Sequence, residues 1–204
     1  MSVVNCQEEP FRQHLSWGVF VSPNLTGWSH NLDTISTAPD RIHPHFGVDA
    51  GFYLNFHVTP QWSILFGSNI TLEQLRLSTN NENDNLSTLG ADIDLSLSFS
   101  IPCNNLTISL ALGPYTHFML YDLSNDPAMH PYSRNFSYNP RNEEPVFRLN
   151  DFNAGVAAQI SCLNKDGWQL FCKFRLGITD ILNIDSHRLF VRPYKLSLGL
   201  AYNL

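Results

Sequence analysis

Alternation of apolar and polar residues with a period of two runs through almost the whole chain. Successive side chains of a β-strand point to opposite faces, so this period predicts strands and leaves little room for helices. Eight segments carry it: 15–28, 45–58, 62–78, 88–102, 106–121, 149–163, 168–181 and 189–204. They are longer than the five or six residues typical of a strand in a globular sheet.

The connections between these segments alternate in length. Short links, "TPQ", "CNN" and "NKDG", follow the second, fourth and sixth segments. Longer loops are expected at about 29–44, 79–87, 122–148 and 182–188. An up-and-down barrel would gather all the short turns at one end, as in outer-membrane barrels. We therefore predict an all-β fold, an eight-stranded antiparallel up-and-down transmembrane β-barrel over 15–204, with 1–14 as a periplasmic N-terminal segment.

The size of the residues on each face indicates which face is the lumen. The polar face is rich in Gly, Ser, Thr and Asn, and the other carries Phe, Leu, Ile and Trp. The interior of an eight-stranded barrel is just wide enough for side chains to fill, so small polar residues suit it. A water-facing surface would also carry more Lys and Glu than this polar face does. The apolar face is therefore expected to contact lipid. The alternative, a soluble lipocalin-like binder of small ligands, requires an apolar lumen.

Aromatic residues cluster at the expected ends of the strands, on the apolar face. Such belts are typical of the two membrane interfaces. The belt predicted beside the short turns consists of Trp17, Trp62, Phe99, Trp168 and Tyr202. The belt predicted beside the long loops consists of Trp28, Phe46, Phe118, Phe152 and Tyr194.

Several charged residues fall on the face that is expected to line the lumen. Buried charges need partners, and eight strands leave no open channel, so we expect an ion-paired plug rather than an ion path. Segments 88–102 and 189–204 would lie on opposite walls, which would let Asp92 or Asp94 reach Lys195. The expected network consists of Asp49, Glu73, Asp92, Asp94, Lys173, Arg175 and Lys195.

The longest link, 122–148, contains four prolines and several aromatic residues. Long loops on a rigid scaffold are usually either functional or disordered, and the sequence leaves both open. If the loop binds a protein, a glycan or a surface, the candidate contact residues are Tyr132, Phe136, Tyr138 and Phe147.

Other functions find less support. A net charge of −6 without a basic stripe argues against nucleic acid. A lipid A-modifying enzyme would need a nucleophile and a base on the outer face near the loops. Ser29 and His30 are neighbours and would point to opposite faces, which makes them a poor dyad. The spacing of the four cysteines matches no zinc site. The sequence leaves undecided whether two of them form a disulfide. We expect no catalytic residues, metal or cofactor.

Several segments resemble a known family. The stretch "HFGVDAGFYLNFHVTPQWSILFG", the "GPY" at 113–115 and "RLGITDI" at 175–181 are similar to the PorT-type outer-membrane barrels of Bacteroidetes. The resemblance implies a barrel like OmpA or OmpX in the bacterial outer membrane. The first ten residues show no signal peptide, and the resemblance implies that one was removed.

The last strand also resembles the C-terminal signal that the barrel-assembly machinery reads. The residues that carry this likeness are Ser197, Gly199, Tyr202 and Leu204, the last standing where an aromatic residue is usual. The expected partners are outer-membrane lipids, the assembly machinery during biogenesis and other envelope proteins. The expected role is non-enzymatic, either as an accessory subunit of an envelope or secretion complex or as a surface structural or adhesion protein.

Overall fold

The computed structural model describes residues 15–30, 41–78, 83–122, 135–136, 147–149, 152–180, 182–183 and 191–204. Eight long strands dominate: β1 (Leu15–His30), β3 (His45–His57), β4 (Trp62–Ser78), β5 (Asn83–Cys103), β6 (Leu106–Asp122), β9 (Phe152–Asn164), β10 (Trp168–Gly177) and β12 (Val191–Asn203). Four short strands accompany them: β2 (Arg41–His43), β7 (Asn135–Phe136), β8 (Phe147–Leu149) and β11 (Leu182–Asn183). No helix in these ranges is long and apolar enough to cross a membrane.

The long strands form one closed sheet. Each pairs antiparallel with its neighbours in the order β4–β3–β1–β12–β10–β9–β6–β5, and an additional β4–β5 pairing completes the ring. The first and last long strands pair from Gly18 opposite Asn203 to His30 opposite Val191, so closure leaves neither of them as an edge. The prediction of an eight-stranded antiparallel up-and-down barrel is confirmed.

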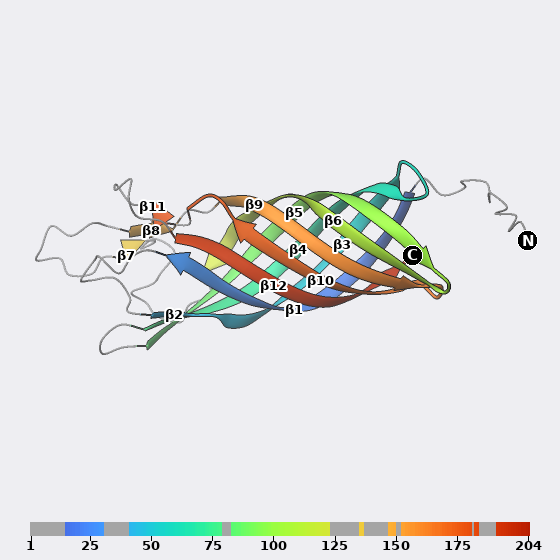
Figure 1. Cartoon of the computed structure of the whole chain (residues 1–204). Coiled ribbons are helices and arrows are strands. Elements are labelled where there is room, and N and C mark those ends of the chain that lie inside the picture. The colour runs from blue at the N-terminus through green and yellow to red at the C-terminus, as the bar shows by residue number, and fades with distance from the viewer. Residues whose placement is uncertain are drawn as a thin grey trace, which may run out of the picture.

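The two ends of the barrel differ (Figure 1). Tight turns and the C-terminus lie at one end, and β2, β7, β8 and β11 lie at the other. Two of the turns use backbone with positive φ, at Asn104 (53°) and Gly167 (86°). Asparagine tolerates this conformation better than most residues with a side chain, and glycine adopts it freely.

Some strand limits differ from those expected. β5 begins at Asn83 and pairs with Ser78 of β4, so the loop expected at 79–87 is largely strand. The added residues, "NDNLS", are mainly polar, and alternation detects only the part of a strand that has one apolar face. β10 ends at Gly177 rather than at 181, because the following residues turn back onto Ala154, whose carbonyl oxygen accepts bonds from the amides of Ile178 and Thr179.

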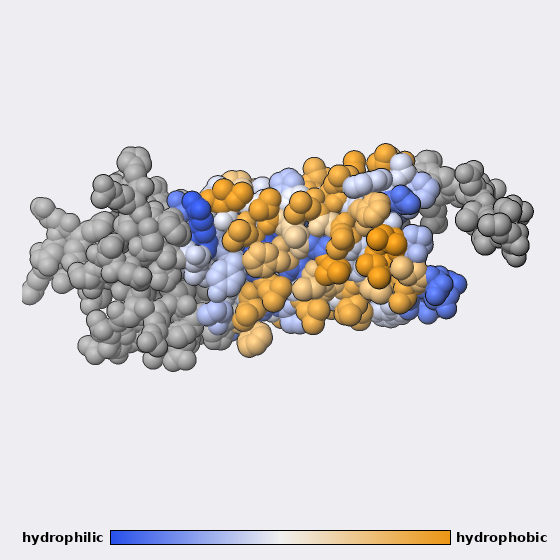
Figure 2. Space-filling view, in the orientation of Figure 1, coloured by the Kyte–Doolittle hydropathy of each residue, from blue (hydrophilic) through white to orange (hydrophobic). Residues whose placement is uncertain are grey.

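The apolar face points outward around the whole ring. Figure 2 shows hydrophobic side chains covering the visible wall between two more polar ends. Exposed apolar residues include Val19, Phe52, Ile70, Leu97, Leu112, Ile160, Leu170 and Leu198. The lumen holds small polar side chains, among them Ser22, Asn24, Thr26, Ser63, Thr71 and Ser197, all at most 2% exposed. This arrangement is the reverse of a lipocalin-like barrel, which carries its apolar face inside.

The lumen also contains bulky residues that the size argument did not foresee. Tyr53 and Phe171 form an apolar cluster with Ala201, against which Phe20 and Leu65 pack. The rings of Phe20 and Phe171 meet edge to face at 5.5 Å. Room for the Phe171 ring comes from Gly199, where a Cβ atom would collide with it.

Trp28 also faces inward, which corrects its expected place in a lipid-facing belt. β1 runs without interruption through His30, so alternation puts Trp28 on the lumen face with Asn24 and Thr26, and it is only 8% exposed. Residue type alone suggested an interface position, whereas strand parity decides the face.

A charge on the lipid face should be costly in proportion to its depth. Leu112, 63% exposed, lies near mid-height on β6, and Leu106 begins the same strand at the turn end. We expect Leu112→Arg to lower the free energy of unfolding by about 2–4 kcal/mol, and Leu106→Arg by about 0–1 kcal/mol. Urea titration in lipid vesicles measures both. Equal costs at the two positions would contradict a lipid-facing band centred on Leu112.

Candidate functional site: a charged network in the lumen

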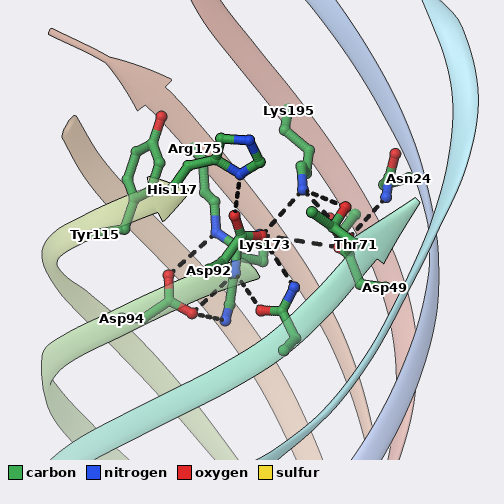
Figure 3. Close-up of polar contacts among 12 residues, drawn as sticks. Asn24, Asp49, Thr71, Asp92, Asp94, Tyr115, His117, Lys173, Arg175 and Lys195 are labelled. Atoms are coloured by element: carbon green, nitrogen blue, oxygen red, sulfur yellow. Dashed lines mark hydrogen bonds and ion pairs between the residues drawn. The ribbon is translucent and has the colours of Figure 1, made fainter. Parts of the chain in front are cut away.

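The lumen charges come from five strands. Asp49 lies on β3, Glu73 on β4, Asp92 and Asp94 on β5, and the three cations on β10 and β12. All seven predicted residues, Asp49, Glu73, Asp92, Asp94, Lys173, Arg175 and Lys195, are at most 9% exposed. Ion pairs join them into one connected network. Figure 3 shows six of them, all but Glu73, with their labels.

Arg175 is the centre of this network. Its Nη1 lies 2.7 Å from Asp92 Oδ2, and its Nε and Nη2 donate to the two oxygens of Asp94 at 3.1 and 2.9 Å. Nη2 also donates to Asn69 Oδ1 at 3.0 Å. The planar guanidinium thus binds Asp94 through two parallel hydrogen bonds and Asp92 through a third. Lysine cannot reproduce this geometry. Arg175 itself is 2% exposed.

Lys195 links three carboxylates from three strands. Its Nζ lies 2.6 Å from Glu73 Oε1, 3.1 Å from Asp92 Oδ2 and 3.2 Å from Asp49 Oδ1. It also donates to Thr71 Oγ1 at 2.9 Å. A buried ammonium group requires such partners, because burying an unpaired charge costs far more than its contacts return.

The rest of the network supports these two cations. Lys173 Nζ donates to Asp94 Oδ2 at 2.9 Å and lies 5.7 Å from the centre of the Phe20 ring. Asp49 accepts bonds from Asn24 Nδ2 at 2.8 Å and from Ser197 Oγ at 3.1 Å. Every buried charge in the described barrel therefore has an oppositely charged neighbour within 4 Å.

Several network members were not found from the sequence. His117 Nδ1 lies 2.6 Å from Asp92 Oδ1, and Asn69 Nδ2 donates to Asp92 Oδ2 at 2.9 Å. Thr71 and Asn24 are further partners. The signal for all four was available, because each shares the lumen parity of its strand. None of the four is Asp, Glu, Lys or Arg, the residue types on which the predicted network rested.

The predicted aromatic belt beside the short turns is placed on the outer face. Trp62 contacts Phe99 and Trp168 contacts Tyr202, with the ring centres of each pair 4.9 Å apart. Trp17 lies on the same face and is 47% exposed. At the loop end, Phe118 and Phe152 form a similar outward pair at 5.2 Å.

The residues of the suggested C-terminal signal divide between the two faces of β12. Ser197 and Gly199 point into the lumen, where Ser197 contacts Asp49 and Gly199 leaves room for Phe171. Tyr202 and Leu204 point outward, at 37% and 59% exposure.

The loop candidates are only partly within the described residues. Phe136 and Phe147 pair through their backbones in the small β11–β8–β7 sheet at the loop end. Tyr132 and Tyr138 lie outside the described residues.

The network lies between two small pockets of the lumen. The pocket on the turn side is lined by residues such as Phe20, Leu65, Gln169 and Phe171. The pocket on the loop side is lined by residues such as Trp28, Tyr115, His117 and Met119. In the described part of the chain, no group of three His, Cys, Asp or Glu side chains is arranged to hold a metal ion.

A serine and a histidine lie in contact at the turn end of the lumen. Ser16 Oγ lies 3.3 Å from His57 Nε2, and Asn55 Nδ2 approaches the same nitrogen at 3.4 Å. The pair faces the lumen at the turn end. An enzyme acting on lipid A would need its dyad on the outer face at the opposite end, so this pair does not meet that requirement.

A closed antiparallel barrel with an outward apolar belt and a polar, ion-paired lumen defines an integral bacterial outer-membrane β-barrel. The chain belongs to the family described as outer membrane protein beta-barrel domain, whose profile matches residues 5–183. A search of curated proteins finds no match.

Solved structures of outer-membrane proteins are similar to this chain. OprG from Pseudomonas aeruginosa is similar at a TM-score of 0.57 and 10% identity, over 94% of this chain and 98% of that one. Ail of Yersinia pestis matches at 0.48 and 9% identity, over 94% and 100%. Neisserial surface protein A matches at 0.45 and 10% identity, over 93% and 99%. At these identities the likeness to OprG concerns the fold alone.

Proposed function

We propose that this barrel is non-enzymatic and non-conducting, and that it acts through partners that bind its loop end. It would serve as an accessory subunit of an envelope or secretion complex, or as a surface structural or adhesion protein. The observation that carries this proposal is the charged network, in which Arg175 and Lys195 bridge opposite walls of the lumen. A lumen closed by paired buried charges offers no wide path for a solute.

Two further features support a role in binding. The sequence resembles the PorT-type barrels of Bacteroidetes, which makes a secretion complex a natural setting. The longest link carries Tyr132, Phe136, Tyr138 and Phe147, and large aromatic side chains are enriched at protein interfaces. Outer-membrane lipids surround the belt, and the barrel-assembly machinery would recognise Tyr202 and Leu204 during biogenesis.

Affinity capture from the native envelope tests the partner proposal. The tagged protein is solubilised in mild detergent and its companions are identified by mass spectrometry. We expect a stoichiometric envelope protein that disappears when Tyr132, Phe136, Tyr138 and Phe147 are all changed to serine. Cys103→Ser, at the last residue of β5 beside a short turn at the opposite end, is the matched control and should keep the companion. Reproducible absence of any companion would favour a lone surface barrel.

Planar bilayer recording tests the closed lumen. We expect no large, steady single-channel currents from the wild-type protein, because the network spans the lumen. A variant combining Arg175→Ala and Lys195→Ala should conduct measurably more if it remains folded, since both bridging side chains are gone. Large steady currents from the wild type would contradict the plug.

A further inference from the structure

We propose that the loop-side pocket of the lumen binds a small organic cation, such as a protonated primary amine with an apolar body. The geometry behind this is an aromatic wall above a floor of paired charges, which belongs to a buried network with one more carboxylate than cation. This binding site is separate from the partner contacts proposed for the loops.

The walls of this pocket are largely apolar. Trp28 comes from β1, and Tyr115 and Met119 come from β6. The hydroxyl group of Tyr115 donates to Asn153 Oδ1 at 3.1 Å, which fixes the ring against the lumen wall. Trp28 and Tyr115 are both at most 8% exposed. Aromatic faces of this kind attract cations and accept apolar groups.

The floor of the pocket is the side of the charged network that faces the loop end. Glu73, Asp92, Lys195 and Arg175 all line it. The two carboxylates and two cations of the floor balance each other. The whole buried network of the described barrel has four carboxylates and three cations, so one negative charge is in excess. Such an excess favours a bound cation over a bound anion, because the low-dielectric surroundings strengthen each charge interaction.

His117 presents a ring nitrogen to the pocket. Its Nδ1 lies 2.6 Å from Asp92 Oδ1, and a neutral ring would donate from this nitrogen to the carboxylate. Its other nitrogen, Nε2, has no hydrogen-bond partner among the residues that the structure describes, and the side chain is 18% exposed. In that tautomer Nε2 carries a lone pair, which can accept a bond from an ammonium group.

A different charge state of His117 would reverse the preference of the pocket. A protonated His117 would make the network neutral without a ligand, and Nε2–H would then donate a bond. The pocket would in that case prefer a carboxylate or a neutral acceptor. A ligand series of constant shape and varied charge therefore separates the two arrangements.

The test uses the full chain refolded in detergent and titrated with benzylammonium, benzyl alcohol and benzoate. Trp28 reports binding by fluorescence, because Trp17, Trp62 and Trp168 lie on the outer face at the turn end. Trp28→Phe verifies the reporter, and calorimetry measures the affinity independently. We expect saturable binding of benzylammonium at least tenfold tighter than benzyl alcohol, and no detectable binding of benzoate.

Two variants locate the site. Glu73→Gln removes the excess charge and should weaken benzylammonium binding at least tenfold. Gln159→Ala, in the turn-side pocket, is the matched control and should leave it unchanged. Heat-modifiable gel mobility confirms that each variant is folded. Benzoate binding as tight as benzylammonium, no saturable benzylammonium binding, or an unchanged affinity in folded Glu73→Gln would each overturn the proposal.

Discussion

Replacing Arg175 with methionine should lower the free energy of unfolding by about 3–5 kcal/mol, the usual cost of removing one partner from a buried ion pair. Methionine keeps much of the side-chain length, so the loss comes mainly from charge. Asp92 and Asp94 would lose three short bonds, and Asn69 would lose one. Urea titration in lipid vesicles, followed by gel mobility, gives the unfolding free energy.

Two companion variants identify the cause of that loss. Asp94→Asn added to Arg175→Met restores the original charge balance and should recover part of the stability. Arg192→Met is the control, because the Arg192 side chain is 46% exposed and its 3.5 Å contact with Asp180 is screened by water. We expect it to cost at most about 1 kcal/mol. A similar loss from both arginine variants would contradict a special role for the buried network.

The double substitution Tyr202→Ala with Leu204→Ala should reduce insertion into the membrane of living cells by tenfold or more. These outward residues carry the likeness to the signal read by the assembly machinery. Their structural contribution is modest, since Tyr202 contacts Trp168 and the backbone bonds of this end remain. Refolding of the purified variant into vesicles should therefore be nearly normal. Surface labelling in cells and gel mobility in vitro measure the two quantities.

A matched pair on the same strand serves as the control. Leu198→Ala with Leu200→Ala removes two side chains that are also outward and apolar, at 57% and 46% exposure. This control should insert in cells at close to the wild-type level. If it fails as badly as the terminal pair, general loss of lipid contact explains the defect. If neither pair fails, the proposed signal is wrong.

The fold was predictable because one pattern covers nearly every strand. Alternation specified the strands, and the small size of residues such as Gly199 and Ser197 on one face indicated the lumen. Lumen parity also placed Asp49, Arg175 and Lys195 on one interior surface. The opposite positions of two strands in the ring suggested that Asp92 or Asp94 would reach Lys195, and Asp92 lies 3.1 Å from it. The other pairings could not be predicted, because they depend on how far each strand is shifted along its neighbour.

Local residue type misled where strand parity or packing decided the outcome. Trp28 is typical of an interface, yet it lines the lumen. Phe20 and Phe171 are too large for an evenly filled barrel, but Gly199 opens space for one ring. The polar start of β5 is held by backbone bonds to β4 and carries little hydrophobic signal. Each of these features depends on three-dimensional neighbours that a single strand does not encode.

The order of the network residues along the chain has a consequence for how the barrel is made. All four carboxylates lie in the first half of the chain, and the three cations lie in its last 32 residues. The bonds joining them span 81 positions between Arg175 and Asp94 and 146 between Lys195 and Asp49. A growing sheet that lacks β10 and β12 therefore holds its acids without counter-charges, and only wet surroundings can tolerate them. The last strands to be made bring in the three cations, so we expect release into lipid to follow closure of the chain.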